Sequence, residues 1–197
     1  MNFSAVILAG GESRRMGRDK AWIEVRGQPL LSRALATVRR AGADEVFVSG
    51  RKDGNYPGVD CPVLFDLNPG SGPLGGIERA LGAMHSPMLL VLAVDLPNMT
   101  ARFLRRLILC CDDRTGVVPK CRGELEPLAA IYPKRCHVLA LDALRQTRLA
   151  ARDFAEVCLL EAAVRTFPVA AADFVRFANC NSPGDLAVTE SPRPSRS

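Results

Sequence analysis

The stretch Leu8-Ala9-Gly10-Gly11-Glu12-Ser13-Arg14-Arg15-Met16-Gly17-Arg18-Asp19-Lys20 decides how the rest of the sequence is interpreted. The apolar run that leads into it, from Ala5 to Leu8, is typical of a strand buried on both faces of a parallel sheet. A glycine pair ends that run, and glycine lets backbone N–H groups approach a ligand because it has no Cβ. Three arginines and a lysine follow, and these side chains supply the charge that binds phosphate. Strand, glycine turn and cationic loop together predict a site for a nucleotide phosphate.

This stretch differs from the two best-known phosphate-binding loops. It lacks the Gly-x-Gly-x-x-Gly pattern of dinucleotide-binding folds. Lys20 is followed by an alanine, whereas the lysine of a P-loop is followed by Ser or Thr. For any single glycine pair, a strand-to-helix turn with a solvated basic rim is the favoured alternative. The whole thirteen-residue string favours the phosphate site instead.

Length, composition and charge describe an ordinary globular protein. The 197 residues suffice for one substantial domain, and the 48% hydrophobic and 24% charged residues are typical values. The net charge of +5 is compatible with nucleic-acid binding, but the basic residues are scattered and few aromatic residues lie among them. We therefore expect an anionic small molecule, and no nucleic acid, as the partner.

The cysteines and the apolar runs indicate the cellular compartment in which the protein works. Seven cysteines without a Cys-x-x-Cys pair, accompanied by only two histidines, show no zinc-ligand spacing. We expect free thiols in a reducing compartment. The sequence has no signal-peptide pattern, and its longest apolar run, Met88 to Val94, is too short to span a bilayer. These observations predict a cytoplasmic protein without a membrane partner.

Strand and helix patterns alternate along the first half of the sequence, which predicts an α/β fold. We expect one Rossmann-like domain over residues 1–190, a three-layer sandwich with a mostly parallel sheet, and a disordered tail at 191–197. Extended segments are predicted at 5–8, 21–25, 45–49, 63–65, 88–94, 115–119, 126–132, 165–169 and 174–178. Helices are predicted at 30–41, 74–84, 100–111, 135–145, 152–160 and 183–189. The segment 88–94 is the most apolar and should be the central strand.

Two aspartates follow predicted strands and are candidates for ligand binding, because ligands of open parallel sheets bind beyond the carboxyl ends of the strands. Asp95 is a natural Mg²⁺ ligand opposite a cationic phosphate loop, although a turn aspartate before Pro97 is the alternative. The phosphate loop favours the metal interpretation for Asp95. For Asp66, which precedes Asn68-Pro69-Gly70, a ligand role and ordinary turn chemistry are equally supported.

The opening string resembles the amino-terminal signature of the nucleotidyltransferases, in the form Leu-Ala-Gly-Gly-x-Ser-x-Arg-Met-Gly-x-Asp-Lys that is typical of molybdenum cofactor guanylyltransferases. Further segments resemble this family and occur in its order. They are Gly72-Pro73-Leu74-Gly75-Gly76, Asp95-Leu96-Pro97, Glu126-Pro127-Leu128-x-Ala130-x-Tyr132 and Asn179-x-Asn181-x-Pro183-x-Asp185-Leu186. The resemblance covers residues 3 to about 188. Residues 47–50 depart from it, because they lack the asparagine that some relatives carry after the second strand.

The resemblance implies a fold of the nucleotide-diphospho-sugar transferase type with GTP as the nucleotide. It implies that Leu8, Ala9 and Gly10 bind guanine and ribose through their backbone, with Gly11 in the same nucleotide-binding turn. Asp66 would add a contact to guanine or ribose.

The resemblance also implies the catalytic residues and the second substrate, molybdopterin. Arg15 and Lys20 would hold the triphosphate, and Asp95 would hold the cofactor Mg²⁺. Asn179 and Asn181 would face the pterin, although loop capping is the favoured explanation of these asparagines from the residues alone. Other cofactor-biosynthesis proteins or apo-molybdoenzymes would be transient partners.

The implied reaction is attack by the terminal phosphate of molybdopterin on the α-phosphorus of GTP, which expels pyrophosphate. It relies on positioning and charge neutralisation and needs no nucleophilic side chain. Two alternatives remain at this point: a related enzyme that uses CTP or acts on a sugar phosphate, and a nucleotide-binding regulatory domain without turnover.

Overall fold

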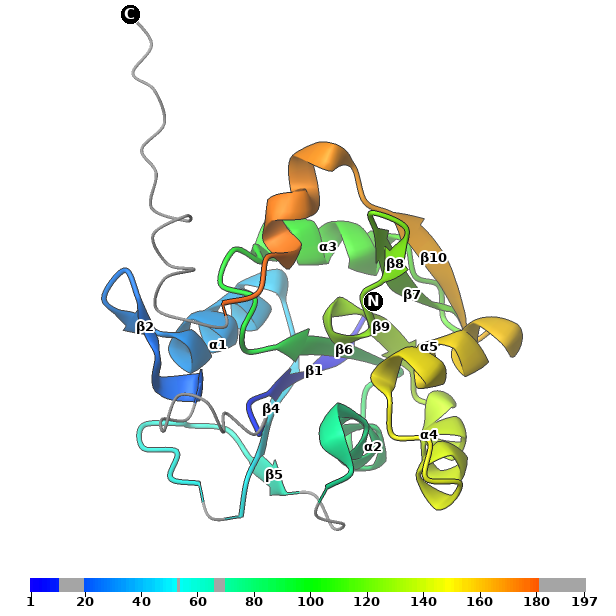
Figure 1. Cartoon of the computed structure of the whole chain (residues 1–197), viewed down its shortest axis with the longest axis horizontal. Coiled ribbons are helices and arrows are strands. Elements are labelled where there is room, and N and C mark those ends of the chain that lie inside the picture. The colour runs from blue at the N-terminus through cyan, green and yellow to red at the C-terminus, as the bar shows by residue number, and fades with distance from the viewer. Residues whose placement is uncertain (11–19, 53, 66–69, 181–197) are drawn as a thin grey trace, which may run out of the picture.

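The fold of the chain is seen in a computed structural model, which describes residues 1–10, 20–52, 54–65 and 70–180. An eight-stranded sheet lies at its centre, with helices on both faces (Figure 1). The strand order is β10-β7-β9-β6-β1-β4-β5, with β8 paired to β7, and β2 and β3 form a separate small sheet. The strands are β1 (Phe3–Leu8), β2 (Glu24–Val25), β3 (Gln28–Pro29), β4 (Glu45–Gly50), β5 (Val63–Phe65), β6 (Met88–Ala93), β7 (Gly116–Cys121), β8 (Glu124–Leu125), β9 (Ile131–Pro133) and β10 (Val164–Pro168). The helices are α1 (Leu30–Ala41), α2 (Gly72–Ala83), α3 (Ala101–Leu109), α4 (Cys136–Arg145) and α5 (Ala151–Leu160), with 3-10 helices η1 (Lys20–Trp22), η2 (Pro127–Ala129) and η3 (Ala171–Phe177).

The sheet is mostly parallel, as the sequence predicts. Strand β1 pairs in parallel with β4 and with β6, and β4 pairs in parallel with β5. Strand β9 is antiparallel to both of its neighbours, β6 and β7. All six residues of β6 are buried, and the strand lies in the middle of the order, so its prediction as the central strand is confirmed.

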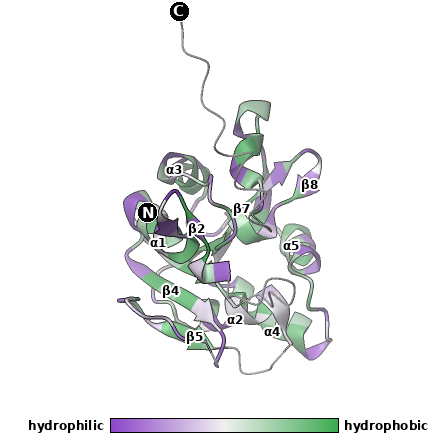
Figure 2. Ribbon diagram, turned by 60° about the vertical axis from the view of Figure 1, so that its left-hand side comes forward, coloured by the Kyte–Doolittle hydropathy of each residue, from purple (hydrophilic) through white to green (hydrophobic). Residues whose placement is uncertain are grey.

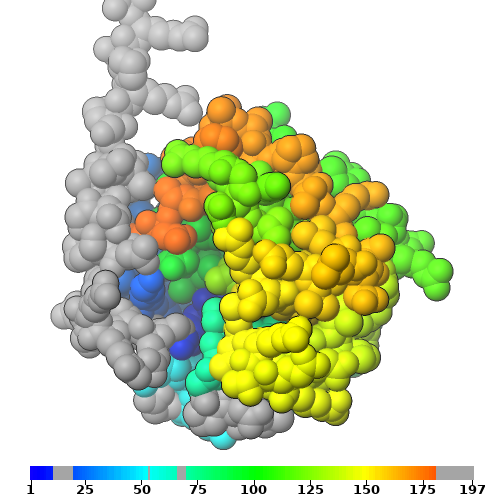
Figure 3. All heavy atoms as spheres, turned by 45° about the vertical axis from the view of Figure 1, so that its right-hand side comes forward, coloured from blue at the N-terminus to red at the C-terminus, as the bar shows by residue number. Residues whose placement is uncertain are grey.

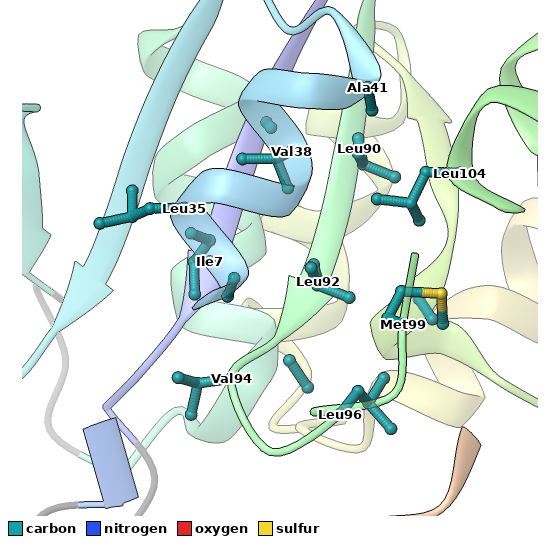
Figure 4. Close-up of a cluster of buried hydrophobic side chains, with 14 of the residues drawn as sticks. Ile7, Leu35, Val38, Ala41, Leu90, Leu92, Val94, Leu96, Met99 and Leu104 are labelled. Carbon is teal, nitrogen blue, oxygen red and sulfur yellow. The ribbon is translucent and has the colours of Figure 1, made fainter. Parts of the chain in front are cut away.

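Two apolar cores lie on opposite faces of the sheet, because successive side chains of a strand point to opposite sides. On one face Ile7 and Leu92 pack with Val38 of α1 and Leu104 of α3 (Figure 4). On the other face Val91 and its alternate neighbours pack with α2, α4 and α5. Figure 2 shows hydrophobic residues on the inner strands and hydrophilic residues on outer turns and at β8. The predicted three-layer sandwich is confirmed.

Local signals place several element ends. Gly42 caps α1 with a φ of +104°, a left-handed conformation that glycine adopts without strain. The Oγ1 atom of Thr100 accepts a hydrogen bond from the backbone N–H of Phe103, and α3 begins just after this threonine. The predicted helices at 30–41, 74–84, 100–111, 135–145 and 152–160 are all present, with ends that differ by one or two residues.

Two of the predicted extended segments are wrong in part, and a third, 174–178, is wrong throughout. Residues 20–22 form a 3-10 turn, closed by a bond from the N–H of Ile23 to the carbonyl of Lys20, and only 24–25 are extended. At 126–132 the strand is limited to β9, since Pro127 has no N–H for a ladder and begins a 3-10 turn. At 174–178 the chain is in η3, where the three-residue spacing of Phe174 and Phe177 places both rings against the core.

Some predictions lie outside the described residues or are tested only in part. The helix at 183–189, the tail at 191–197 and the end of the domain at 190 fall in the range that the structure does not describe.

All seven cysteines are free thiols, as expected. In the described part of the chain, every helix is too short or too polar to cross a membrane.

Candidate functional site

The carboxyl ends of three neighbouring strands form the candidate site. Strand β1 lies between β4 and β6 and runs parallel to both. The pairing continues one residue past β1, because the N–H of Ala9 donates to the carbonyl of Ser49 at 2.9 Å. On the other side, the N–H of Val94 donates to the carbonyl of Leu8 at 3.2 Å. The turn after β1 and Asp95 therefore lie at the same edge of the sheet.

A lysine and an aspartate from distant parts of the sequence meet at this edge. Lys20 begins η1, which is anchored by the fully buried Ala21. The Nζ atom of Lys20 lies 3.2 Å from Oδ2 of Asp95, and the two side chains are 23% and 21% exposed. The ammonium group of lysine is suited to binding phosphate and a carboxylate to binding a divalent metal, and this pair places the two kinds of group side by side.

Gly10 lies beside the end of β4, with room for a small side chain between the two segments. A Cβ atom at this position would lie 3.5 Å from the carbonyl carbon of Gly50 and 3.8 Å from Cγ of Arg51, which are ordinary contacts. The protein itself would therefore accept a methyl group at Gly10. The missing side chain faces the backbone of Gly50.

Gly76 of α2 contrasts with Gly10, because its environment has no space for a side chain. A Cβ atom at Gly76 would lie 2.2 Å from Oγ and 2.8 Å from Cβ of Ser49. The glycine lets α2 pack closely on β4 and β1, and this contact fixes the strands that end at the site.

Tyr56 fixes the loop after β4, and sequence analysis missed it. Its hydroxyl accepts a hydrogen bond from the N–H of Arg51 at 2.8 Å. A Cβ atom at Gly50 would lie 2.6 Å from the tyrosine ring. The available signal was a lone aromatic residue in a loop rich in Gly, Asn and Pro, and this pattern did not indicate which residues the ring contacts.

The C-terminal part of the described chain reaches the same edge. The N–H of Cys180 donates to the carbonyl of Asp95 at 2.9 Å, and Cys180 is buried. Asn179, the preceding residue, is exposed and lies beside this contact. Figure 3 shows the orange-red residues that end at 180 on the same face as green and blue residues from earlier in the chain. Asn179, predicted to face the second substrate, thus lies near Asp95.

The segment Glu126–Tyr132 is hydrogen-bonded to the central strand, β6. The hydroxyl of the fully buried Tyr132 donates to the carbonyl of Pro127 at 3.0 Å, and burial raises the pKa of this phenol. The N–H of Val91 donates to the carbonyl of Ala130 at 2.8 Å. Burial, with a smaller contribution from nearby Glu124, raises the pKa of Glu126. These hydrogen bonds attach the segment to β6 and hold the turn that contains Glu126.

The structure describes five of the predicted site residues, namely Leu8, Ala9, Gly10, Lys20 and Asp95, at one sheet edge, with Asn179 next to them. The other four predicted residues, Gly11, Arg15, Asp66 and Asn181, lie outside the described residues. In the described ranges, no group of three or more metal-ligating side chains gathers in one place. The donor set still fits Mg²⁺, which commonly takes one or two carboxylates and completes its shell with phosphate oxygens and water.

Comparisons with known proteins identify relatives of the chain. A "Probable molybdenum cofactor guanylyltransferase" from Opitutus terrae is 34% identical over 185 residues, which cover 92% of this chain and 92% of the relative. A "Molybdenum cofactor guanylyltransferase" from Xanthomonas euvesicatoria pv. vesicatoria is 33% identical, with 92% of this chain and 90% of the relative covered.

Solved structures share the fold. The molybdopterin-guanine dinucleotide biosynthesis protein A from Archaeoglobus fulgidus superposes with a TM-score of 0.73 at 24% identity, over 95% of this chain and 96% of that one. The 2-C-methyl-D-erythritol 4-phosphate cytidylyltransferase from Thermus thermophilus gives a TM-score of 0.72 at 23% identity, over 96% and 98% of the two chains. Residues 5–171 match the family described as the MobA-like NTP transferase domain, and the chain belongs to this family.

Proposed function

We propose that the protein transfers GMP from GTP to the terminal phosphate of molybdopterin, with release of pyrophosphate. The contact between Lys20 and Asp95 carries this proposal, because it combines a phosphate-binding cation and a metal-binding carboxylate at the end of the central strands. The curated relatives named above support the identity of the substrates.

The residues at the sheet edge have separate roles in this reaction. The backbone at 8–10 receives the nucleoside, and Gly10 places no side chain beside it. Lys20 binds the triphosphate and neutralises the charge that develops on the leaving pyrophosphate. Asp95 holds Mg²⁺, which when bound supplies further positive charge to the phosphate oxygens. Arg15 and Asn181 complete the nucleotide and pterin sides in this proposal.

The chemistry requires no histidine base, because the attacking phosphate is already an anion. His85 is engaged by Glu45, with 2.7 Å between Nδ1 and Oε1. His137 of α4 is engaged by Glu78 of α2, with 2.9 Å between Nε2 and Oε1. Both pairs lie away from the edge formed by Asp95, so positioning and charge neutralisation are the available means of catalysis.

Pyrophosphate release tests this proposal. The purified protein would be incubated with molybdopterin, Mg²⁺ and one nucleotide at a time, GTP, CTP, UTP or ATP. We expect release with GTP and formation of the guanine dinucleotide, detected by mass spectrometry. Release with CTP alone would instead support the cytidylyl alternative. Release only with a sugar phosphate as acceptor would support the other enzyme alternative, and binding without release would support the regulatory domain.

The partner and compartment predictions complete the proposal. Transient contacts with proteins that deliver molybdopterin or receive the product follow from the reaction, since the product must reach an apo-molybdoenzyme. The cytoplasmic location expected from the sequence remains a prediction.

A further inference from the structure

A buried aspartate outside the candidate site holds two arginines. Asp173 of η3 is only 7% exposed. One carboxylate oxygen accepts a hydrogen bond from Nη1 of Arg106 at 2.7 Å, and the other accepts one from Nε of Arg176 at 2.7 Å. Hydrogen bonds from Arg176 and then Arg106 lower the pKa of Asp173, so the carboxylate is charged at neutral pH. Arg106 belongs to α3, and this cluster therefore joins η3 to α3.

The two arginines of the cluster pack against a group of phenylalanine rings. The ring of Phe103 contacts Phe167 edge-on at 6.1 Å and Phe177 at 5.5 Å between centroids. The guanidinium groups of Arg106 and Arg176 lie 5.5 and 5.8 Å from the centroid of the same ring. Ion pairs that are shielded on one side by rings hold their geometry better than exposed pairs do.

Two further contacts connect this cluster to the loop that carries Asp95. The Nη1 atom of Arg176 donates to Oγ1 of Thr100 at 3.2 Å. Beyond η3, the N–H of Cys180 donates to the carbonyl of Asp95 at 2.9 Å. The loop 95–100 is thus attached to the C-terminal segment at its first and its last residue.

We propose that Asp173, together with Arg106 and Arg176, is a positioning residue that holds Asn179 beside Asp95 on the acceptor side of the site. The contacts described for the three side chains join them to one another and to Thr100, and they act through the path of the chain from η3 to Cys180. The identity of the acceptor rests on the proposed function. The positioning itself rests on the contacts described above.

The direct test replaces Asp173 by asparagine, which keeps the shape and removes the charge that binds both arginines. The matched control is Asp142→Asn, because Asp142 also pairs with an arginine, Arg145 at 3.1 Å, but on the exposed side of α4. We expect Asp173→Asn to raise the KM for molybdopterin about tenfold and to change the Kd for Mg²⁺–GTP less than about twofold. The control should match the parent protein in both quantities.

Amide hydrogen exchange provides a measurement that needs no substrate. In Asp173→Asn the Cys180 amide should exchange about tenfold faster than in the parent, whereas amides of β1 and β6 should keep their protection. If the parent shows no turnover with GTP and molybdopterin, the proposed function fails, and the exchange rates still decide the positioning role.

A second variant covers the case in which Asp173→Asn does not fold. Arg176→Lys keeps the charge but loses the fork that reaches both Asp173 and Thr100, and we expect a smaller rise in the same KM and in Cys180 exchange. Unchanged KM and exchange in the folded variants would overturn the proposal. Equal losses for molybdopterin and Mg²⁺–GTP would also overturn it, since they would indicate general damage to the fold.

Discussion

The central strands carry carboxylates at both ends, and those at the amino ends (the amino edge) have different partners from those at the carboxyl ends (the carboxyl edge). At the amino edge, Glu45 accepts hydrogen bonds from Oγ of Ser4 at 2.6 Å and from the N–H of His85 at 2.9 Å. These contacts, that of Ser4 first, lower its pKa to about 2. At the carboxyl edge, Asp95 contacts the ammonium group of Lys20 at the end of a long side chain. Backbone and hydroxyl donors hold Glu45 in the fold, whereas Asp95 pairs with a group that in the proposed function binds the triphosphate.

Substitutions at the carboxyl edge should separate function from stability, and their effect should be the largest. We expect Asp95→Asn and Lys20→Ala each to reduce turnover at least about 100-fold, because each removes charge that stabilises the transition state. The midpoint of thermal unfolding should stay within about 3 °C of the parent, since both side chains are partly exposed. Steady-state pyrophosphate release and calorimetry measure the two quantities. Full activity in either variant would contradict the role assigned to that residue.

The two glycines near the site sharpen the same comparison. Gly76→Ala should lower the unfolding midpoint by several degrees, because overpacking against Ser49 costs about 1–3 kcal/mol. Gly10→Ala should leave the midpoint nearly unchanged, because the methyl group makes only ordinary contacts with Gly50 and Arg51. It should weaken Mg²⁺–GTP binding about tenfold or more, because in the proposed function the nucleoside lies against the backbone at 8–10. Isothermal titration and differential scanning calorimetry test both. If Gly10→Ala bound GTP like the parent, the backbone at Gly10 would not contact the nucleotide.

Glu45→Gln probes the amino edge and should have the smallest effect. A carboxyl group with a lowered pKa stabilises the folded state above its unfolded pKa of about 4.5, and the stabilisation is lost as the pH falls towards 2. The variant should therefore be less stable than the parent at pH 7, by about 1 kcal/mol after allowance for solvent screening, and this difference should shrink by pH 3. Urea unfolding at the two pH values measures it, and turnover at pH 7 should be retained. A difference that grows on acidification would contradict the assigned contacts.

Local patterns predicted much of the fold and the separate parts of the site. Buried apolar runs identified β1 and β6, and capping residues such as Gly42 and Thr100 located helix ends. The sequence also indicated that Lys20 and Asp95 belong to one site, because strands of a parallel sheet end at the same edge. Their direct contact spans 75 positions, and it depends on the neighbouring placement of β1 and β6.

Features that depend on distant contacts escaped prediction. Asp173 directly precedes residues 174–178, which the sequence predicts to be extended. Nothing in its local spacing indicates that it pairs with Arg106, which lies 67 positions away. Likewise the sequence shows Gly10 and Gly76 as similar members of glycine pairs. Only the positions of Gly50 and Ser49 reveal that a methyl group fits at Gly10 and that none fits at Gly76, where the glycine permits helix packing.

The most direct test of the account is the thermal unfolding midpoint with GTP or CTP, each with and without Mg²⁺, for the parent and for Asp95→Asn. A ligand that binds only the folded state raises this midpoint by mass action. We predict a rise with GTP that requires Mg²⁺ in the parent and is lost in Asp95→Asn. A rise of equal size in both proteins, or none with any nucleotide, would contradict the assignment of the carboxyl edge as a metal-dependent GTP site.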